Sequence, residues 1–77
     1  MMNKEEFIQL LQEKKYKTAQ NILSEMNDMD TAAFLEELDA KECALAFRLI
    51  SKEKAADVFS CMNSKMQTYL VDMFSET

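Results

Sequence analysis

The chain has 77 residues, 48% of them hydrophobic, and a formal net charge of −5 from 14 acidic and 9 basic side chains. This length allows one small domain over residues 1–77, and the apolar share excludes a disordered chain. The negative charge argues against nucleic-acid binding, which depends on neutralising phosphates, but it is compatible with divalent cations or a basic protein surface.

Glycine and proline are both absent, so the chain lacks the residues that normally make tight turns and stop helices. Because β-hairpins depend on such residues, we expect helices joined by junctions of one or two residues. No apolar run approaches the roughly 18 residues that a membrane-spanning helix requires. The N-terminus lacks the apolar region of a signal peptide, so we expect a soluble, cytoplasmic chain without direct membrane insertion.

Six short helices are predicted in chain order, over residues 4–14, 17–26, 28–38, 40–50, 52–62 and 64–74. Asn3 suits the N-cap of the first helix, and Glu6 completes a capping box. The second helix begins within the sequence KKYK, which offers no good cap. The caps expected for the later helices are Asn27, Asp39 with Glu42 in a second capping box, Ser51 and Asn63.

A twelve-residue repeat runs through these helices and is clearest around Phe34, Leu35 and Leu38. The Phe34 position recurs as Leu10, Ile22, Ala46, Val58 and Leu70, the Leu35 position as Leu11, Leu23, Phe47, Phe59 and Val71, and the Leu38 position as Met26, Ile50, Met62 and Phe74. These positions form one apolar stripe on each helix, and helices of about ten residues are too short to be stable alone. We therefore predict an all-α superhelix, a short α-solenoid of about six helices with a 12-residue repeat.

The middle of the chain is acidic. Seven acids and a single base, Lys41, lie between residues 25 and 42; the acids are Glu25, Asp28, Asp30, Glu36, Glu37, Asp39 and Glu42. One interpretation is a solvated face, in which several of these carboxylates serve helix starts. The other is a weak site for hard divalent ions, which prefer carboxylate oxygens, completed by ligands from elsewhere.

Two cysteines, Cys43 and Cys61, lie 18 residues apart in a chain without histidine. This pattern fits neither a zinc site nor a disulfide framework. Cys43 occupies a small-residue position of the repeat, which favours a buried structural thiol, and a regulatory disulfide is the alternative. Since no histidine or other activating base accompanies either thiol, we expect no catalytic residues and no enzyme activity.

Apolar residues outside the regular stripe indicate where partners could bind. Met26 and Met62 fall in the core positions, whereas Met29, Met66 and Met73 are candidates for an adhesive surface. The last predicted helix carries Leu70, Val71, Met73 and Phe74, an apolar set for a terminal element. It either folds back completely or meets another domain or a second copy, so a homodimer through this end is one hypothesis.

The segment from Asp30 to Phe74 resembles the cytosolic N-terminal domain of MgtE-type magnesium transporters. The resemblance rests on motifs in order and without gaps: Ala32-Ala33, the sequence LEELD, an FRLI segment, an EKAADV segment and a helix with Gln67. It implies a right-handed superhelix of short helices that acts as a cytosolic regulatory domain. In that family the domain packs on CBS domains when magnesium is plentiful, and ions between the acidic surfaces keep the gate closed.

The resemblance also names one metal ligand. A family ligand is the acid of the EKAADV-like segment, which is Asp57 here, so Asp57 is expected to bind Mg²⁺ weakly and only with ligands from a partner domain. The chain length fits two interpretations, a piece of a transporter or a free-standing protein. Similar superhelices occur in flagellar switch and motility proteins such as FliG, so the alternative function is a protein-interaction or scaffold module without ion dependence.

Overall fold

In the computed structural model, which describes residues 3–75, six α-helices follow one another without any strand. They are α1 (Lys4–Gln12), α2 (Tyr16–Glu25), α3 (Asp28–Glu36), α4 (Ala40–Leu49), α5 (Lys52–Cys61) and α6 (Ser64–Ser75). The predicted all-α fold is confirmed, and each helix begins within one residue of its expected start. Two junctions, residues 13–15 and 37–39, have three residues rather than the expected one or two, because α1 and α3 end two residues early.

Polar side chains at twelve-residue intervals begin five of the six helices. In each case a side-chain oxygen accepts a hydrogen bond from the backbone N–H three residues later, at 2.7–3.2 Å. The accepting residues are Asn3, Asn27, Asp39, Ser51 and Asn63. Lys15 occupies the remaining position of this series, before α2, and makes no such bond, as the sequence predicts. The repeat therefore sets where the helices start, through local bonds that satisfy their first free N–H groups.

The end of α1 shows how the chain turns without glycine. Lys14 adopts a positive φ of 61°, a region that normally favours glycine. Its N–H donates to the Leu11 carbonyl at 3.1 Å, and the N–H of Lys15 donates to the Leu10 carbonyl at 2.9 Å. These two bonds make a Schellman motif, which satisfies the last carbonyls of the helix while a lysine occupies the strained position.

Replacing Lys14 with glycine should raise the free energy of unfolding by about 0.5–1 kcal/mol. A left-handed conformation costs a residue with a side chain roughly 1–2 kcal/mol, and part of this gain is lost because glycine is more flexible when unfolded. Urea denaturation measures the difference. Lys17→Gly, within α2, is the control and should instead lose about 0.5–1 kcal/mol. A Lys14→Gly variant that is less stable than the parent would contradict the claim that the backbone of Lys14 is strained.

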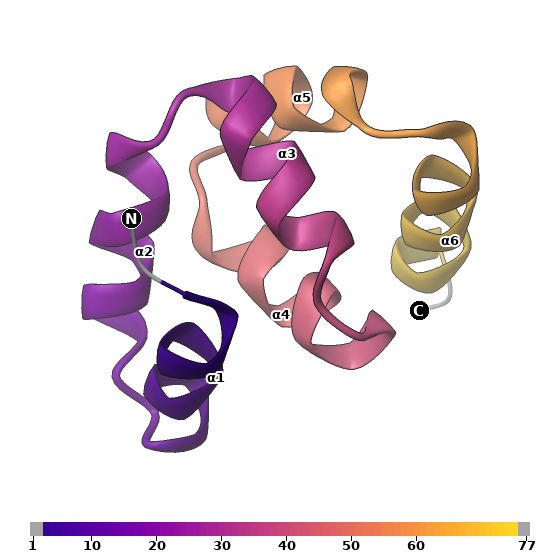
Figure 1. Cartoon of the computed structure of the whole chain (residues 1–77). Coiled ribbons are helices and arrows are strands. Elements are labelled where there is room, and N and C mark those ends of the chain that lie inside the picture. Colours follow the sequence, from indigo (N-terminus) through magenta and orange to yellow (C-terminus); the bar gives the residue numbers. More distant parts are fainter. Residues whose placement is uncertain (1–2, 76–77) are drawn as a thin grey trace.

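The short helices pack on one another as a superhelix. α3 lies mainly against α5 and also against α4, while α2 contacts both α1 and α4. The main contacts therefore join helices that are consecutive or next but one in the chain, as in a solenoid of short repeats. Figure 1 shows α1 and α2 at one side of the molecule and α6 at the other, with α3, α4 and α5 between them. The extents of 27 × 25 × 20 Å show that this short stack closes into a nearly spherical body.

Most of the predicted stripe forms the core. At the Phe34 position, Ala46, Val58 and Leu70 are buried as well, and at the Leu35 position so are Leu11 and Leu23. Phe47 and Phe59 are half-buried and pack edge to face, with ring centroids 6.5 Å apart. Val71 is 54% exposed, so its predicted place in the core is wrong. Val71 occupies the same repeat position as Leu35, but among the described residues no helix packs on that side of α6 and covers its side chain.

Candidate functional site

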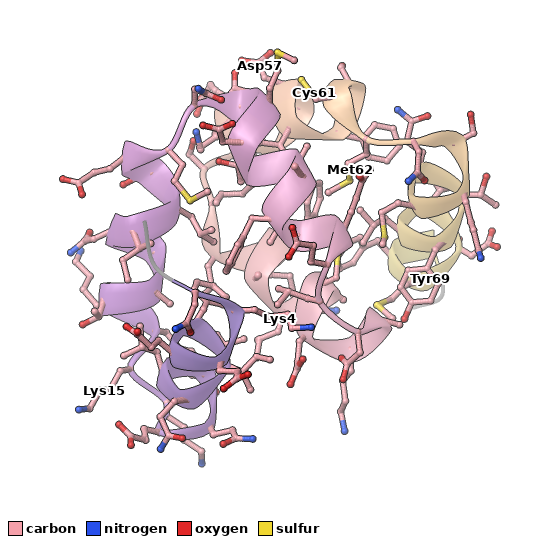
Figure 2. The ribbon with its side chains drawn as sticks, in the orientation of Figure 1. Lys4, Lys15, Asp57, Cys61, Met62 and Tyr69 are labelled. Atoms are coloured by element: carbon pink, nitrogen blue, oxygen red, sulfur yellow. The ribbon has the colours of Figure 1, made fainter. Side chains whose placement is uncertain are left out.

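Asp57 lies on the outer face of α5. Its neighbour Val58 is completely buried, which fixes the rotation of the helix and turns the Asp57 side chain to solvent. Glu53 and Cys61 are one helical turn away on either side and are also exposed. Figure 2 shows Asp57 and Cys61 together at the outer edge of the molecule, directed away from the other helices. The predicted ligand is therefore accessible to a partner surface.

Several carboxylates of the acidic segment already have structural roles. Asp39 caps α4, Asp28 pairs with Lys54 at 3.1 Å, and Glu36 accepts a 2.7 Å hydrogen bond from the backbone N–H of Asn63. Within residues 3–75 no group of three or more acidic, cysteine or histidine side chains could hold a metal ion. Three carboxylates of the segment therefore serve the fold itself, as a helix cap, an ion-pair partner and a hydrogen-bond acceptor.

Three long polar side chains join helices by donating hydrogen bonds to backbone carbonyls, and of these only Gln67 is singled out by the sequence, as part of the family resemblance. Lys54 Nζ donates to the Met26 carbonyl at 2.6 Å, and Gln20 Nε2 donates to the Leu49 carbonyl at 2.6 Å. Gln67 Nε2 donates to the Phe59 carbonyl at 2.7 Å. The accepting carbonyls lie at or near helix C-termini, where carbonyls lack intrahelical partners. The bonds of Lys54 and Gln67 join α5 to the junction between α2 and α3 and to α6, and the bond of Gln20 joins α2 to α4.

A comparison with protein families bears directly on this surface. The model of one family, the MgtE intracellular N domain, matches residues 26–77, about two thirds of the chain. The chain belongs to the MgtE intracellular N domain family. The resemblance of the segment from Asp30 to Phe74 is thereby confirmed, and the match contains α3, α4, α5 and α6 together with Asp57. No curated protein and no solved structure matches the chain.

The MgtE family match associates the chain with the intracellular part of a magnesium transporter. The helices of this N domain are short. Among the described residues, none is both long and apolar enough to cross a membrane.

Cys43 in this MgtE-type domain is the buried thiol that the sequence predicts. It is completely buried on α4, and its Sγ lies 3.7 Å from Met66 Sδ. Burial, with a smaller contribution from the charge of Glu36, raises the pKa of the Cys43 thiol to about 11. The thiol stays protonated at neutral pH and is unreactive. Cys61 is exposed, and both cysteines are free, so the regulatory disulfide gains no support.

Two shallow cavities flank α6 of the N domain. One, of about 310 Å³, lies between the end of α3 and the start of α6 and includes Glu36, Met66 and Tyr69. The other, of about 260 Å³, lies between α4 and α6 and is lined by Lys41, Ala44, Leu45, Arg48 and Met73. Neither lining combines a nucleophile with an activating base.

Proposed function

We propose that the chain is a non-catalytic regulatory domain of an MgtE-type magnesium transporter and contributes to gating by packing on CBS domains in the presence of magnesium. The family match over residues 26–77 is the observation that carries this proposal. It is supported by the exposure of Asp57 on α5, at the position of an acidic ligand in the family resemblance. The regulatory role and the CBS partner come from the resemblance.

Asp57 fits magnesium as one ligand of a shared site. Mg²⁺ requires octahedral oxygen coordination, and proteins usually supply one or two carboxylates while waters complete the shell. Asp57 offers one accessible carboxylate, and Glu53 one turn away offers a second on the same face. Two flexible exposed carboxylates do not make a strong site alone. The proposed ion therefore bridges Asp57 to acidic groups of the partner domain, and affinity in the isolated chain is weak.

Binding to the CBS domains of an MgtE transporter should require both magnesium and Asp57. Isothermal titration should show a complex in millimolar MgCl₂ and none in excess chelator. Asp57→Asn should weaken it by about tenfold or more, equivalent to about 1.4 kcal/mol, because the amide loses the charge that binds the ion. Asp72→Asn is the matched control, because Asp72 is also an exposed aspartate but lies on α6. This variant should bind like the parent.

The alternative function makes the opposite prediction in the same experiment. A helical interaction or scaffold module without ion dependence would bind its partner equally in magnesium and in chelator, and Asp57→Asn would have no effect. An NMR titration of the chain with MgCl₂ gives a second reading. Shifts confined to the surroundings of Asp57 and lost in Asp57→Ala support the magnesium-dependent domain, whereas identical shifts in both proteins contradict a role for this carboxylate.

A further inference from the structure

The cavity between α4 and α6 is an apolar groove that two cations also line. Ala44, Leu45 and Met73 supply its apolar lining, and the exposed side chains of Lys41 and Arg48 form what we call its charged rim. Lys41 and Arg48 are seven residues apart on α4, which separates them by about 10.5 Å along the helix axis. Neither cation takes part in the ion pairs that form within residues 3–75. Although the chain as a whole is acidic, this groove is locally positive and attracts negatively charged groups of a partner.

Of the two cations of the rim, Arg48 is already partly ordered in the unbound chain. The Arg48 guanidinium lies over the ring of Phe74, 5.1 Å from its centroid, and that ring stacks on Phe47 at 5.8 Å. A cation over an aromatic face is attracted by the ring, so Arg48 loses less conformational freedom on binding. Preordered side chains of this kind reduce the entropic cost of association. The groove is therefore suited to a partner whose carboxylates have a matching separation.

The outer face of α3 has the matching arrangement. Asp30 and Glu37 are also seven residues apart, and Glu37 continues the helical geometry with φ −84° and ψ −14°. Both side chains are exposed, as is Ala33 between them. Met29 projects beside this line and is 73% exposed. The face thus presents two carboxylates about 10.5 Å apart along the axis, together with a flexible apolar side chain that can enter the groove.

We infer that the groove between α4 and α6 binds the outer face of α3 from a second copy of this chain. Met29 of one copy enters the apolar groove of the other, while Asp30 and Glu37 face the cations Lys41 and Arg48. Charge complementarity and equal spacing select this occupant. Because two different surfaces meet, the contact is heterologous. It needs no magnesium and does not rest on the proposed function.

Charge reversal on each surface tests the contact. The groove variant carries Lys41→Glu and Arg48→Glu, and the face variant carries Asp30→Lys and Glu37→Lys. Sedimentation equilibrium in chelator, from about 10 μM to about 1 mM, should show the mass of the parent rising with concentration. Each variant alone should associate at least about tenfold more weakly, because like charges then face one another. An equimolar mixture of the two variants should recover association, because opposite charges meet again.

Folding is controlled separately. Circular dichroism should show the same helicity for all proteins, and the single variants Lys41→Glu and Glu37→Lys replace the double variants if either fails to fold. A parent that stays monomeric at about 1 mM, a mixture that stays monomeric, or variants that associate like the parent would each overturn the inference. So would groove signals shifted in NMR by an added acidic helical peptide while the parent remains monomeric, since the groove would then take a different partner.

Discussion

Replacing Leu35 with alanine should lower the free energy of unfolding by about 2–5 kcal/mol. Leu35 is completely buried on α3, the helix that packs on both α4 and α5. Truncation removes apolar contacts and leaves a cavity, and both effects destabilise the folded state. A chain of this length is stabilised by about 4–12 kcal/mol in total. The loss therefore takes a large share of the stability, and urea denaturation followed by circular dichroism measures it.

Val71→Ala is the matched control, since Val71 occupies the same position of the repeat in α6. Its side chain is 54% exposed, so the change should be within about 0.5 kcal/mol of zero. The two variants together separate position in the repeat from burial. Equal losses for Leu35→Ala and Val71→Ala would contradict the structure, because α6 would then bury a residue that the described fold leaves in solvent.

The helix starts were predictable because their determinants are local. An N-cap bond joins residues three apart, so the side chain that makes it is already present in the sequence pattern. Asn27 and Asp39 act as expected, and Lys15 fails to cap as its chemistry requires. The buried stripe follows from helical periodicity in the same way. Burial at the end of the stack did not follow, because the exposure of Val71 depends on which helices surround it.

The candidate site was predictable only in part, for a related reason. The position of Asp57 came from the family resemblance, and its exposure follows from the burial of Val58 beside it. The proposed shared ion site also involves carboxylates of a partner domain, and no pattern within residues 3–75 gives their positions. The groove between α4 and α6 is formed by residues more than twenty positions apart, and no local pattern announces such a surface.

Lys54 departs from the local rules for helix starts. It lies in the first turn of α5, where a carboxylate would be favoured by the helix dipole and a cation is unfavourable. The structure gives the compensation. The Lys54 ammonium donates to the Met26 carbonyl at 2.6 Å and pairs with Asp28 at 3.1 Å, and its side chain is only 14% exposed. The lysine therefore fastens α5 to the junction between α2 and α3.

Lys54→Met should lower the free energy of unfolding by about 2–3 kcal/mol, since hydrogen bonds to charged groups contribute about 1.5–3 kcal/mol and the carbonyl of Met26 loses its side-chain donor. Methionine keeps much of the aliphatic stem, so lost packing contributes little. Thermal unfolding followed by circular dichroism measures the change. Lys52→Met, at an exposed lysine of the same helix, is the control and should stay within about 0.5 kcal/mol of the parent.

Asp28→Asn then separates the two bonds of Lys54. Asp28 is 38% exposed in its side chain, and an ion pair with such access to solvent contributes only about 0–1 kcal/mol. We therefore expect Asp28→Asn to cost much less than Lys54→Met, because the bond to the Met26 carbonyl survives. Equal losses in the two variants would place the stabilisation in the ion pair instead. In that case high salt should also destabilise the parent strongly, whereas a bond to a backbone carbonyl is less sensitive to screening.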